Sequence, residues 1–338
     1  MRSASRLLLI GRSVWLCLTA VLALAVASTP AVSAPVVAGF SVTVYATATD
    51  PMNMSFALDG ALHIGRDNIG SGGDFGDAVK VSKIAAGGGT AQEFGESSIA
   101  DPDSVLVDRH GLISGTIGSV LVGGGAGLYA INPDGSVHTV YTAAKVRGDI
   151  DDMQFDSTGR LLMISGQDQI KYSTGGDLEV LMSVSTSTPV SMAIDGANRI
   201  FLAGISGTVS IYDALGTLIQ ADFLTGLGPN PRIRFGGGGA FGTDLYVMDN
   251  AGDLFSVAAD GTKTLFGSGF GAGTVMTAGS WIAFGPDGAL YVAEFPNDRV
   301  LRIAALVSVP EPATLALVGA ALIGMVTTRR RRPAAPSA

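Results

Sequence analysis

Cysteine and histidine are scarce in this chain of 338 residues, with one and three copies respectively. The single cysteine, Cys17, lies in an N-terminal segment that is expected to be removed, so the mature chain should hold no thiol. Disulfides, thiolate metal sites and cysteine nucleophiles are thereby excluded. No histidine stands in a readable order with a serine and an aspartate, which argues against a Ser-His-Asp triad. The three are His63, His110 and His138.

Basic and aromatic residues are also few. The chain has 21 Lys and Arg against 29 Asp and Glu, and residues 35–310 hold 14 basic and 28 acidic side chains. Such an acidic protein repels nucleic acid and anionic lipid and attracts cations, so we expect no nucleic-acid partner. Aromatic residues make up 7% of the chain, too few for an evident sugar-stacking platform. Phosphate-loop and dinucleotide fingerprints are missing as well.

The N-terminus has the plan of a secretory signal peptide. Three arginines precede an apolar run over residues 14–26, which is the length of the apolar region of such signals. Small residues allow cleavage after Ala27, whereas cleavage after Ala34 would place Pro35 next to the scissile bond. We therefore expect residues 1–34 to contain a signal peptide that signal peptidase cleaves near position 27 or 34.

The C-terminus carries a second apolar segment between a proline-rich triplet and a basic cluster. The apolar run over residues 313–326 has 14 residues, fewer than the roughly 20 of a committed membrane span. The arginines that follow would stay on the cytoplasmic side. These features predict a short hydrophobic helix that holds an exported chain transiently in the inner membrane. The flanking residues are Pro310, Glu311 and Pro312 before the run, and Arg329, Arg330, Arg331 and Arg332 after it.

These three pieces resemble the PEP-CTERM sorting signal of Gram-negative bacteria. The resemblance covers residues 308–332 and leaves residues 333–338 as a disordered tail. It implies that a membrane peptidase, exosortase, cleaves near the Pro-Glu-Pro triplet and releases the body to the cell surface or extracellular matrix. An ordinary tail anchor is the alternative.

Between the two terminal segments, a pair of short apolar strands around an Asp- and Gly-rich turn recurs six times. The first strands end 39 to 51 residues apart, and a period of 40–50 residues is the length of one four-stranded propeller blade. The sequence therefore predicts an all-β, six-bladed β-propeller over residues 35–307. The first strands end at Phe56, Val107, Phe155, Ile194, Phe235 and Phe284. The second strands are expected at residues 62–64, 112–113, 161–163, 200–202, 245–247 and 290–292.

The last unit lacks a fourth strand. Its third strand, over residues 300–306, is followed directly by the sorting signal, while residues 40–45 form a strand with no unit of their own. Propellers commonly close by adding an N-terminal strand to the last blade, which removes an open edge. We expect residues 40–45 beside residues 300–303. A linker strand or a separate sandwich is the alternative.

The repeated units resemble the NHL, gluconolactonase and regucalcin superfamily of six-bladed propellers. The clearest copy is the Pro-Asp-Gly turn with Leu-Tyr-Val in residues 284–294, and the likeness is architectural rather than functional. Its lactonase branch implies carboxylates just before the inner strands that hold a divalent metal in the channel. Only two of the six equivalent positions are acidic, Asp103 and Asp151, whereas the lactonase pattern has three.

Asp103 and Asp151, with the adjacent Asp152, are candidate Ca²⁺ ligands, because hard cations take several oxygen ligands. The alternative is that these aspartates cap turns. Trp281, at the start of an inner strand, and Glu294, near a channel mouth, are candidate ligand-binding residues.

Two classes of function remain open. One is a non-catalytic surface or matrix protein that binds a glycan, peptide or small molecule at one face of the propeller or serves as a scaffold in the extracellular polymer, and the sequence does not separate these two roles. The other is a divalent-metal lactonase-like or sugar-processing hydrolase that uses the channel. The few histidines and the incomplete carboxylate set favour the first.

Overall fold

The computed structural model describes residues 34–67, 77–125, 127–166, 168–185, 187–273 and 279–306. These residues form six sheets and only one short α-helix, α1 (Ala143–Val146). The all-β, six-bladed architecture predicted from the repeats is thereby confirmed. Within the described residues, no helix combines the length and the apolar character that crossing a membrane requires. The expected signal peptide, apart from Ala34, and the sorting-signal residues 308–332 lie outside the described residues.

Each blade is a meander whose strands follow one another from the ring axis to the rim. Blade 1 consists of β3 (Pro51–Phe56), β4 (Leu62–Arg66), β5 (Ala78–Ile84) and β7 (Gln92–Ala100). Blade 2 consists of β8 (Ser104–Asp108), β9 (Ser119–Gly124), β10 (Gly127–Ile131) and β11 (Val137–Thr142). Blade 3 consists of β12 (Asp152–Phe155), β13 (Leu161–Ser165), β14 (Gln169–Ser173) and β15 (Glu179–Ser183).

The second half of the ring repeats this plan. Blade 4 consists of β16 (Pro189–Ile194), β17 (Ile200–Gly204), β18 (Thr208–Tyr212) and β19 (Leu218–Leu224). Blade 5 consists of β20 (Arg232–Phe235), β21 (Leu245–Met248), β22 (Leu254–Val257) and β23 (Lys263–Ser268). Blade 6 begins with β24 (Ser280–Phe284), β25 (Leu290–Glu294) and β26 (Arg299–Ala305). Two 3₁₀ turns, η1 (Gly239–Phe241) and η2 (Phe295–Asn297), lie in connections.

The N-terminal segment adds strands to two blades. β2 (Phe40–Thr47) pairs antiparallel with β26, with Val42 opposite Ile303. β1 (Val36–Val37) pairs with the rim strand of blade 5, and β6 (Gly89–Thr90) makes a short parallel pair with β2. The expectation of four strands in every blade is therefore wrong for blades 5 and 6, which have five. The extra strands cover rim edges that would otherwise present unpaired backbone groups.

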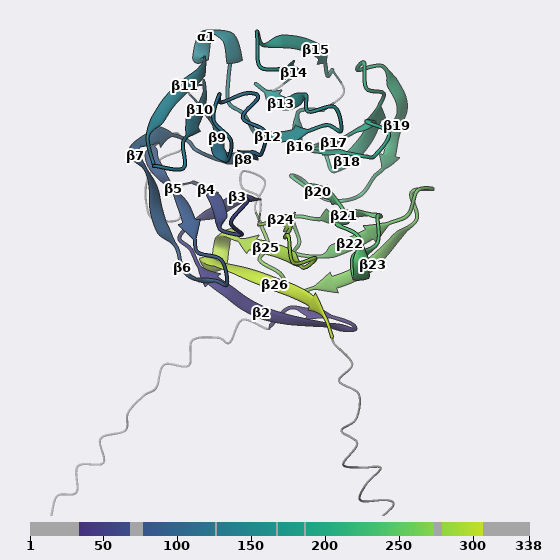
Figure 1. Ribbon diagram of the computed structural model, residues 1–338. Coiled ribbons are helices and arrows are strands. Elements are labelled where there is room, and N and C mark those ends of the chain that lie inside the picture. Colours follow the sequence, from purple (N-terminus) through teal and green to yellow (C-terminus); the bar gives the residue numbers. More distant parts are fainter. Residues whose placement is uncertain are drawn as a thin grey trace, which may run out of the picture. The chain divides into compact units, whose positions relative to one another are not determined.

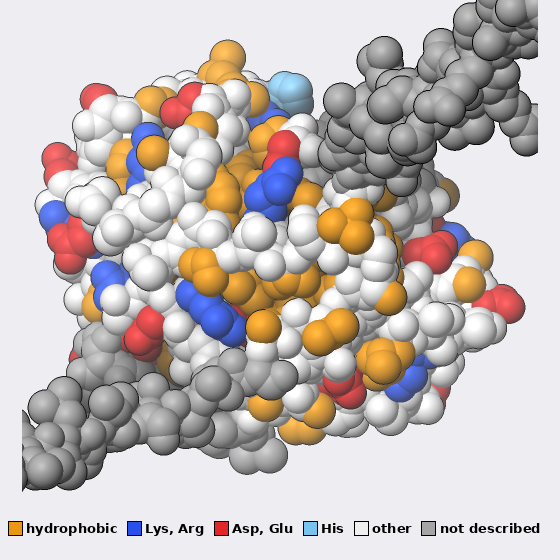
Figure 2. Space-filling model, turned by 90° about the horizontal axis from the view of Figure 1, so that it is seen from below, with side chains coloured by type: hydrophobic (Ala, Val, Ile, Leu, Met, Phe, Trp, Pro, Cys, Tyr) orange, Lys and Arg blue, Asp and Glu red, His pale blue; other side chains and the backbone are white. Residues whose placement is uncertain are grey.

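Neighbouring inner strands contact one another around the ring, and the last, β24, contacts the first, β3. Figure 1 shows these strands around a common axis, with β2 and β26 at the rim. The apolar core lies mainly between blades: Phe201 of blade 4, for example, belongs to one buried cluster with Leu245 and Val247 of blade 5. Figure 2 views the molecule from the side that carries β2 and β26 and shows hydrophobic side chains over this edge.

The second strand of blade 2 lies later in the chain than expected. Residues 112–113 belong to a turn, and β9 begins only at Ser119. The buried Asp108 carboxylate explains the difference, since it accepts hydrogen bonds from the backbone N–H groups of Ile113 and Ser114, both at 2.9 Å. An aspartate that bonds the following backbone in this way stabilises a turn in competition with a strand.

Candidate functional site

The inner strands of blades 2 and 3 are preceded by the same Asp-x-Asp spacing. Asp101 and Asp103 precede β8, and Asp149 and Asp151 precede β12. Carboxylate oxygens of Asp101, Asp103 and Asp149 lie within 4.8 Å of one another. The two segments therefore meet where the inner strands begin. We call these four residues the acidic cluster.

Backbone geometry holds the cluster in place. Asp101 has a positive φ of 52°, and the N–H of Asp103 donates to the carbonyl oxygen of Asp101 at 2.9 Å. The neighbouring strand β4 approaches closely at Gly65, where a Cβ would lie only 2.2 Å from the carbonyl oxygen of Asp103. Glycine is thus required at this position for blades 1 and 2 to pack beside the cluster.

Burial and mutual repulsion disfavour ionised carboxylates here. Burial, and then the charges of Asp101, Asp149, Asp67 and Asp151, raise the pKa of Asp103 well above its usual value. Burial is also the main cause that raises the pKa of Asp149 to about 6 and that of Asp151 to about 7. Like charges held this close repel unless a proton or a cation lies between them.

The acidic cluster fits a hard divalent cation, the group that the propeller resemblance implies. Two oxygen ligands of one Ca²⁺ lie at most about 5 Å apart, given Ca–O distances of about 2.3–2.6 Å. The three carboxylates within 4.8 Å satisfy this limit. In addition, Oδ1 of Asp103 is shielded from solvent and has no hydrogen-bond partner among the described residues. Asp101, Asp103 and Asp149 are therefore the residues that would hold the ion.

A buried arginine lies near the acidic cluster. The guanidinium carbon of Arg232 is 3.7 Å from the centroid of the Trp281 ring, and its Nη1 donates to the carbonyl oxygen of Val190. Burial lowers the pKa of Arg232 to about 10, against the attraction of Asp151 and other aspartates, which raises it. Trp281 is only 2% exposed. A sugar could therefore stack on this tryptophan only after Arg232 had moved.

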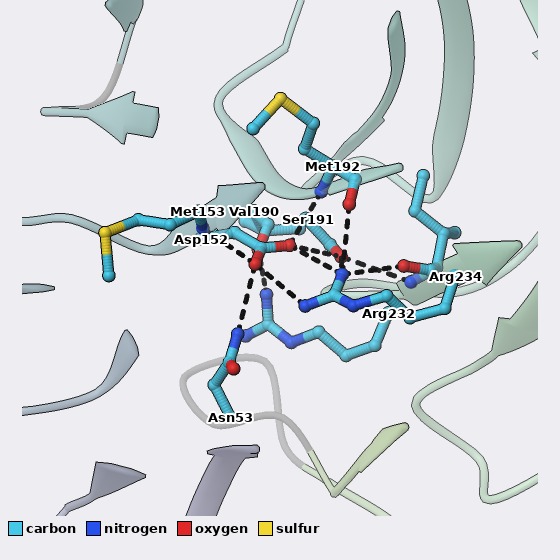
Figure 3. A network of polar contacts seen from close by, with 9 residues as sticks. Asn53, Asp152, Met153, Val190, Ser191, Met192, Arg232 and Arg234 are labelled. Carbon is cyan, nitrogen blue, oxygen red and sulfur yellow. Dashed lines mark hydrogen bonds and ion pairs between the residues drawn. The ribbon is translucent and has the colours of Figure 1, made fainter. Parts of the chain in front are cut away.

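Asp152, a sequence-predicted metal ligand, lies at the centre of a different network, shown in Figure 3. Its carboxylate is 0% exposed and forms two 2.8 Å contacts with the guanidinium of Arg234. The remaining donors are the Asn53 amide at 3.0 Å, the Ser191 hydroxyl at 3.1 Å, and the backbone N–H groups of Met153 and Met192 at 2.9 Å. Both oxygens are fully engaged, so we leave Asp152 out of the proposed ligand set.

Glu294, a sequence-predicted ligand-binding residue, is 0% exposed. One carboxylate oxygen accepts the backbone N–H of Gly271 at 2.8 Å, and the other pairs with Nε of Arg299. These contacts tie the end of β25 to the segment before β24. In this structure the side chain serves the packing of blade 6.

Asp101 and Asp149 were missed because only the position four residues before each strand end was compared. The position six residues before the strand end is an aspartate in three consecutive blades: Asp50, Asp101 and Asp149. This run of acids was a readable sequence signal. The histidines add nothing to the cluster: His63 packs on the Phe94 ring at 4.7 Å, and burial lowers its pKa to about 4.

The fold and the site define a six-bladed β-propeller with carboxylates gathered at one end of the ring axis. A family model described as the PEP-CTERM protein-sorting motif matches residues 308–332. The chain thus carries the motif of an exported protein, and the motif implies processing by exosortase. A comparison with curated proteins gave no match.

Three solved structures illustrate the fold. A protein provisionally assigned as a gluconolactonase has 12% identity and a TM-score of 0.58 over 79% of this chain and 92% of its own. The gluconolactonase of Xanthomonas campestris has 13% identity and a TM-score of 0.55 over 80% and 91%. An auxiliary nutrient-binding protein of Bacteroides thetaiotaomicron has 11% identity and a TM-score of 0.53 over 78% and 76%. At such identities the likeness shows the fold alone.

Proposed function

We propose that this protein is an exported, exosortase-processed propeller of the cell surface or extracellular matrix that binds a ligand without catalysing a reaction. The proposed location outside the cell is supported by the sorting motif over residues 308–332. A non-catalytic role is supported by the site itself. The side chains of Asp152, Glu294 and Trp281 contact the arginines Arg234, Arg299 and Arg232, respectively. His63 contacts Phe94, and His138 contacts the carbonyl oxygen of Ser114, so neither of these two contacts involves the acidic cluster.

The processing half of this proposal predicts the mass of the mature chain. Protein recovered from culture medium or matrix should begin near Ser28 or Pro35 and end near Pro310, because both terminal segments are removed. Replacing Pro310, Glu311 and Pro312 together with alanine should leave the C-terminal segment attached and the protein in the membrane fraction. Intact-mass spectrometry of the two fractions measures both outcomes.

The control for this experiment replaces three residues of the tail beyond the motif with alanine, Pro333, Pro336 and Ser337, and this variant should be processed normally. Released wild-type protein that retains Arg329 to Arg332 would contradict exosortase processing. Wild-type protein that stays in the membrane with an intact tail would indicate a simple tail anchor.

A metal-dependent hydrolase is the second candidate, and the acidic cluster favours it. A bound divalent cation would polarise a carbonyl oxygen as a Lewis acid. Asp151, the fourth carboxylate of the acidic cluster, would accept a proton from the attacking water as a general base. The chain's own residues would thus hold the ion and accept a proton, which is the minimum that lactone hydrolysis requires.

Calcium is expected to raise the melting temperature of the protein. A ligand that binds only the folded state stabilises it by about 2.7 kcal/mol at one hundred times its Kd. Asp103→Asn and Asp149→Asn should each abolish most of this rise, because they remove carboxylates of the set within 4.8 Å. Asp151→Asn is the matched comparison and should retain much of it. Calorimetric melts across a Ca²⁺ titration give these values.

If calcium leaves the melting temperature of the wild-type protein unchanged, these aspartates only cap turns and bind no calcium. The alternative outcome is that the protein binds calcium and hydrolyses sugar lactones. If it does, and Asp103→Asn and Asp149→Asn both lose this activity, the protein is a metal-dependent hydrolase and not a non-catalytic binding protein.

We further propose that β2 closes the ring as the outer strand of blade 6. The antiparallel pairing of Phe40–Thr47 with β26 supports this role. So does the packing of Ala46 and Ala48 in one buried cluster with Met54 of the first blade and Val300 of the last. Deletion of residues 34–47, which removes β1 and β2, tests this role in ring closure.

A further inference from the structure

A cleft of about 420 Å³ lies at the seam where the ring closes, between blade 6 and blade 1. Its volume is within the range of small-molecule sites, about 300–1,000 Å³. Nine of the eleven described residues that line it are polar, and none of the eleven is aromatic. We call it the closure cleft. Its lining includes Thr47, Arg66, Ser82, Thr90, Asn297 and Asp298.

Backbone pairing between distant segments builds the walls of the closure cleft. β6 lies beside the end of β2 (Figure 1), with Thr90 opposite Thr47, and the N–H of Ala91 donates to the carbonyl oxygen of Thr47 at 3.0 Å. On the blade 6 side, the N–H of Ala48 donates to the carbonyl oxygen of Asp298, also at 3.0 Å. The cleft therefore forms only when the ring is closed, and its walls are fixed before a ligand arrives, which lowers the entropic cost of binding.

Several polar side chains of the closure cleft have unused hydrogen-bonding capacity. Within the described ranges, the hydroxyl groups of Ser82 and Thr90 and the side-chain amide of Asn297 form no hydrogen bond. The guanidinium of Arg66 has no carboxylate partner among the same residues, and its Nε is shielded from solvent without a hydrogen-bond acceptor. Polar groups that the protein itself leaves unsatisfied in a cleft are available to a polar ligand.

The polar groups of the closure cleft include both donors and acceptors. Arg66 only donates, the carboxylates of Glu93 and Asp298 only accept, and the hydroxyl and amide groups do both. One oxygen of Asp298 accepts the N–H of Asp50 at 2.9 Å, and Glu93 lies 3.9 Å from Lys80, so neither carboxylate is fully engaged. This mixture matches a polyol, in which every hydroxyl group donates and accepts.

We propose that the closure cleft binds a neutral sugar residue of a glycan. Arg66 and Asn297 donate hydrogen bonds to ring hydroxyl groups, Asp298 accepts them, and the carbon face of the sugar packs on the two lining alanines. An anionic sugar is disfavoured because two carboxylates stand beside one guanidinium. An apolar ligand would leave these polar groups unpaired, and a nucleobase would find no aromatic ring on which to stack.

This inference rests on the proposed binding role and adds a face and a ligand class to it. The experiment uses the mature protein in EDTA, so that no cation at the acidic cluster contributes. The neutral probes are the methyl glycosides of glucose, galactose and mannose. Methyl glucuronoside adds a negative charge, and methoxycyclohexane keeps a six-membered ring without ring hydroxyl groups.

Saturation-transfer NMR and calorimetric titration should show that at least one neutral glycoside binds. Methyl glucuronoside should bind at least about tenfold more weakly than the best neutral glycoside, because a charged group next to like charges is repelled. Methoxycyclohexane should not bind measurably, since it cannot satisfy the polar groups of the cleft.

Arg66→Gln should weaken binding of the best neutral glycoside about tenfold to a hundredfold, because it removes a charged hydrogen-bond donor. Thr90→Val removes one hydroxyl group at an exposed position and should weaken binding roughly twofold to tenfold. Melting curves verify that both variants fold. Arg147→Gln is the matched control, since this exposed arginine caps α1 at the far side of blade 2, and it should bind like the wild type.

A folded wild-type protein that binds none of the neutral glycosides would overturn the sugar as ligand. Tighter binding of methyl glucuronoside than of every neutral glycoside would overturn the neutral class. Unchanged affinity in folded Arg66→Gln and Thr90→Val would show that the sugar binds outside the closure cleft. The processed mass of the exported protein and its lactonase activity, on which the proposed function is judged, are independent of all three results.

Discussion

Replacing Asp152 with alanine is expected to lower the free energy of unfolding by about 3–5 kcal/mol, the range for breaking one side of a buried ion pair. The loss arises because Arg234, only 12% exposed at its side chain, would keep its charge without its carboxylate. The same carboxylate also joins Asn53 of blade 1 to Ser191 of blade 4. Urea denaturation followed by tryptophan fluorescence or circular dichroism measures the change.

The double variant Asp152→Leu with Arg234→Met should lose less stability than Asp152→Ala, because neither buried charge is then left alone. Asp177→Ala is the surface control. Its partner Lys145 lies 2.7 Å away, but both side chains are exposed, so little change is expected. Equal losses in the single and double variants would show that packing, rather than the uncompensated arginine, dominates.

The blade count was predictable because each inner strand ends in a large apolar residue at a regular interval. Phe155, Phe235 and Phe284 are such positions, and the structure places all three where inner strands end. Among the first and second strands of the repeats, the sequence pattern misplaced only the second strand of blade 2. That strand was expected at residues 112–113, whereas β9 begins at Ser119. There the Asp108 carboxylate bonds three successive backbone N–H groups after its strand, and this effect of one side chain has no periodic signature.

The acidic cluster could be predicted only in part. Comparing one offset along the repeats found Asp103 and Asp151, but the closest carboxylates are those of Asp101, Asp103 and Asp149. Asp101 and Asp149 stand at a second shared offset, six residues before the strand ends. Which of the four carboxylates come within 4.8 Å of one another depends on the folded backbone, including the positive φ of 52° at Asp101, and a sequence comparison contains no such geometry.

The Asp152 network could not be predicted from the sequence for a different reason. Asp152, Ser191 and Arg234 belong to blades 3, 4 and 5, and their separation along the chain gives no hint that they share hydrogen bonds.

Removing residues 34–47 is expected to abolish cooperative folding of the propeller. The deletion takes away β1 and β2, exposes the edge of β26, and removes Val37, Phe40 and Val42 from their packing against the last two blades. A fully buried valine or phenylalanine contributes about 1.5–3 kcal/mol. Val37 is buried, and Phe40 and Val42, which are partly buried, each contribute less. Together with the lost backbone pairing of β2 and β26, this loss is a large part of the net stability of an ordinary domain, about 5–15 kcal/mol. Circular dichroism melts should show no sharp transition, and light scattering should show association through the open edge.

Addition of the missing strand as a separate peptide is the decisive control. A peptide spanning residues 34–49 should restore a cooperative melt at micromolar concentration, because an extended peptide can add to an exposed sheet edge through backbone hydrogen bonds. The same peptide with Val42→Asp should fail, since Val42 lies opposite Ile303 and packs toward the buried cluster. If the truncated chain melts at the temperature of the intact protein, β2 is an accessory strand and the six blades hold together without it.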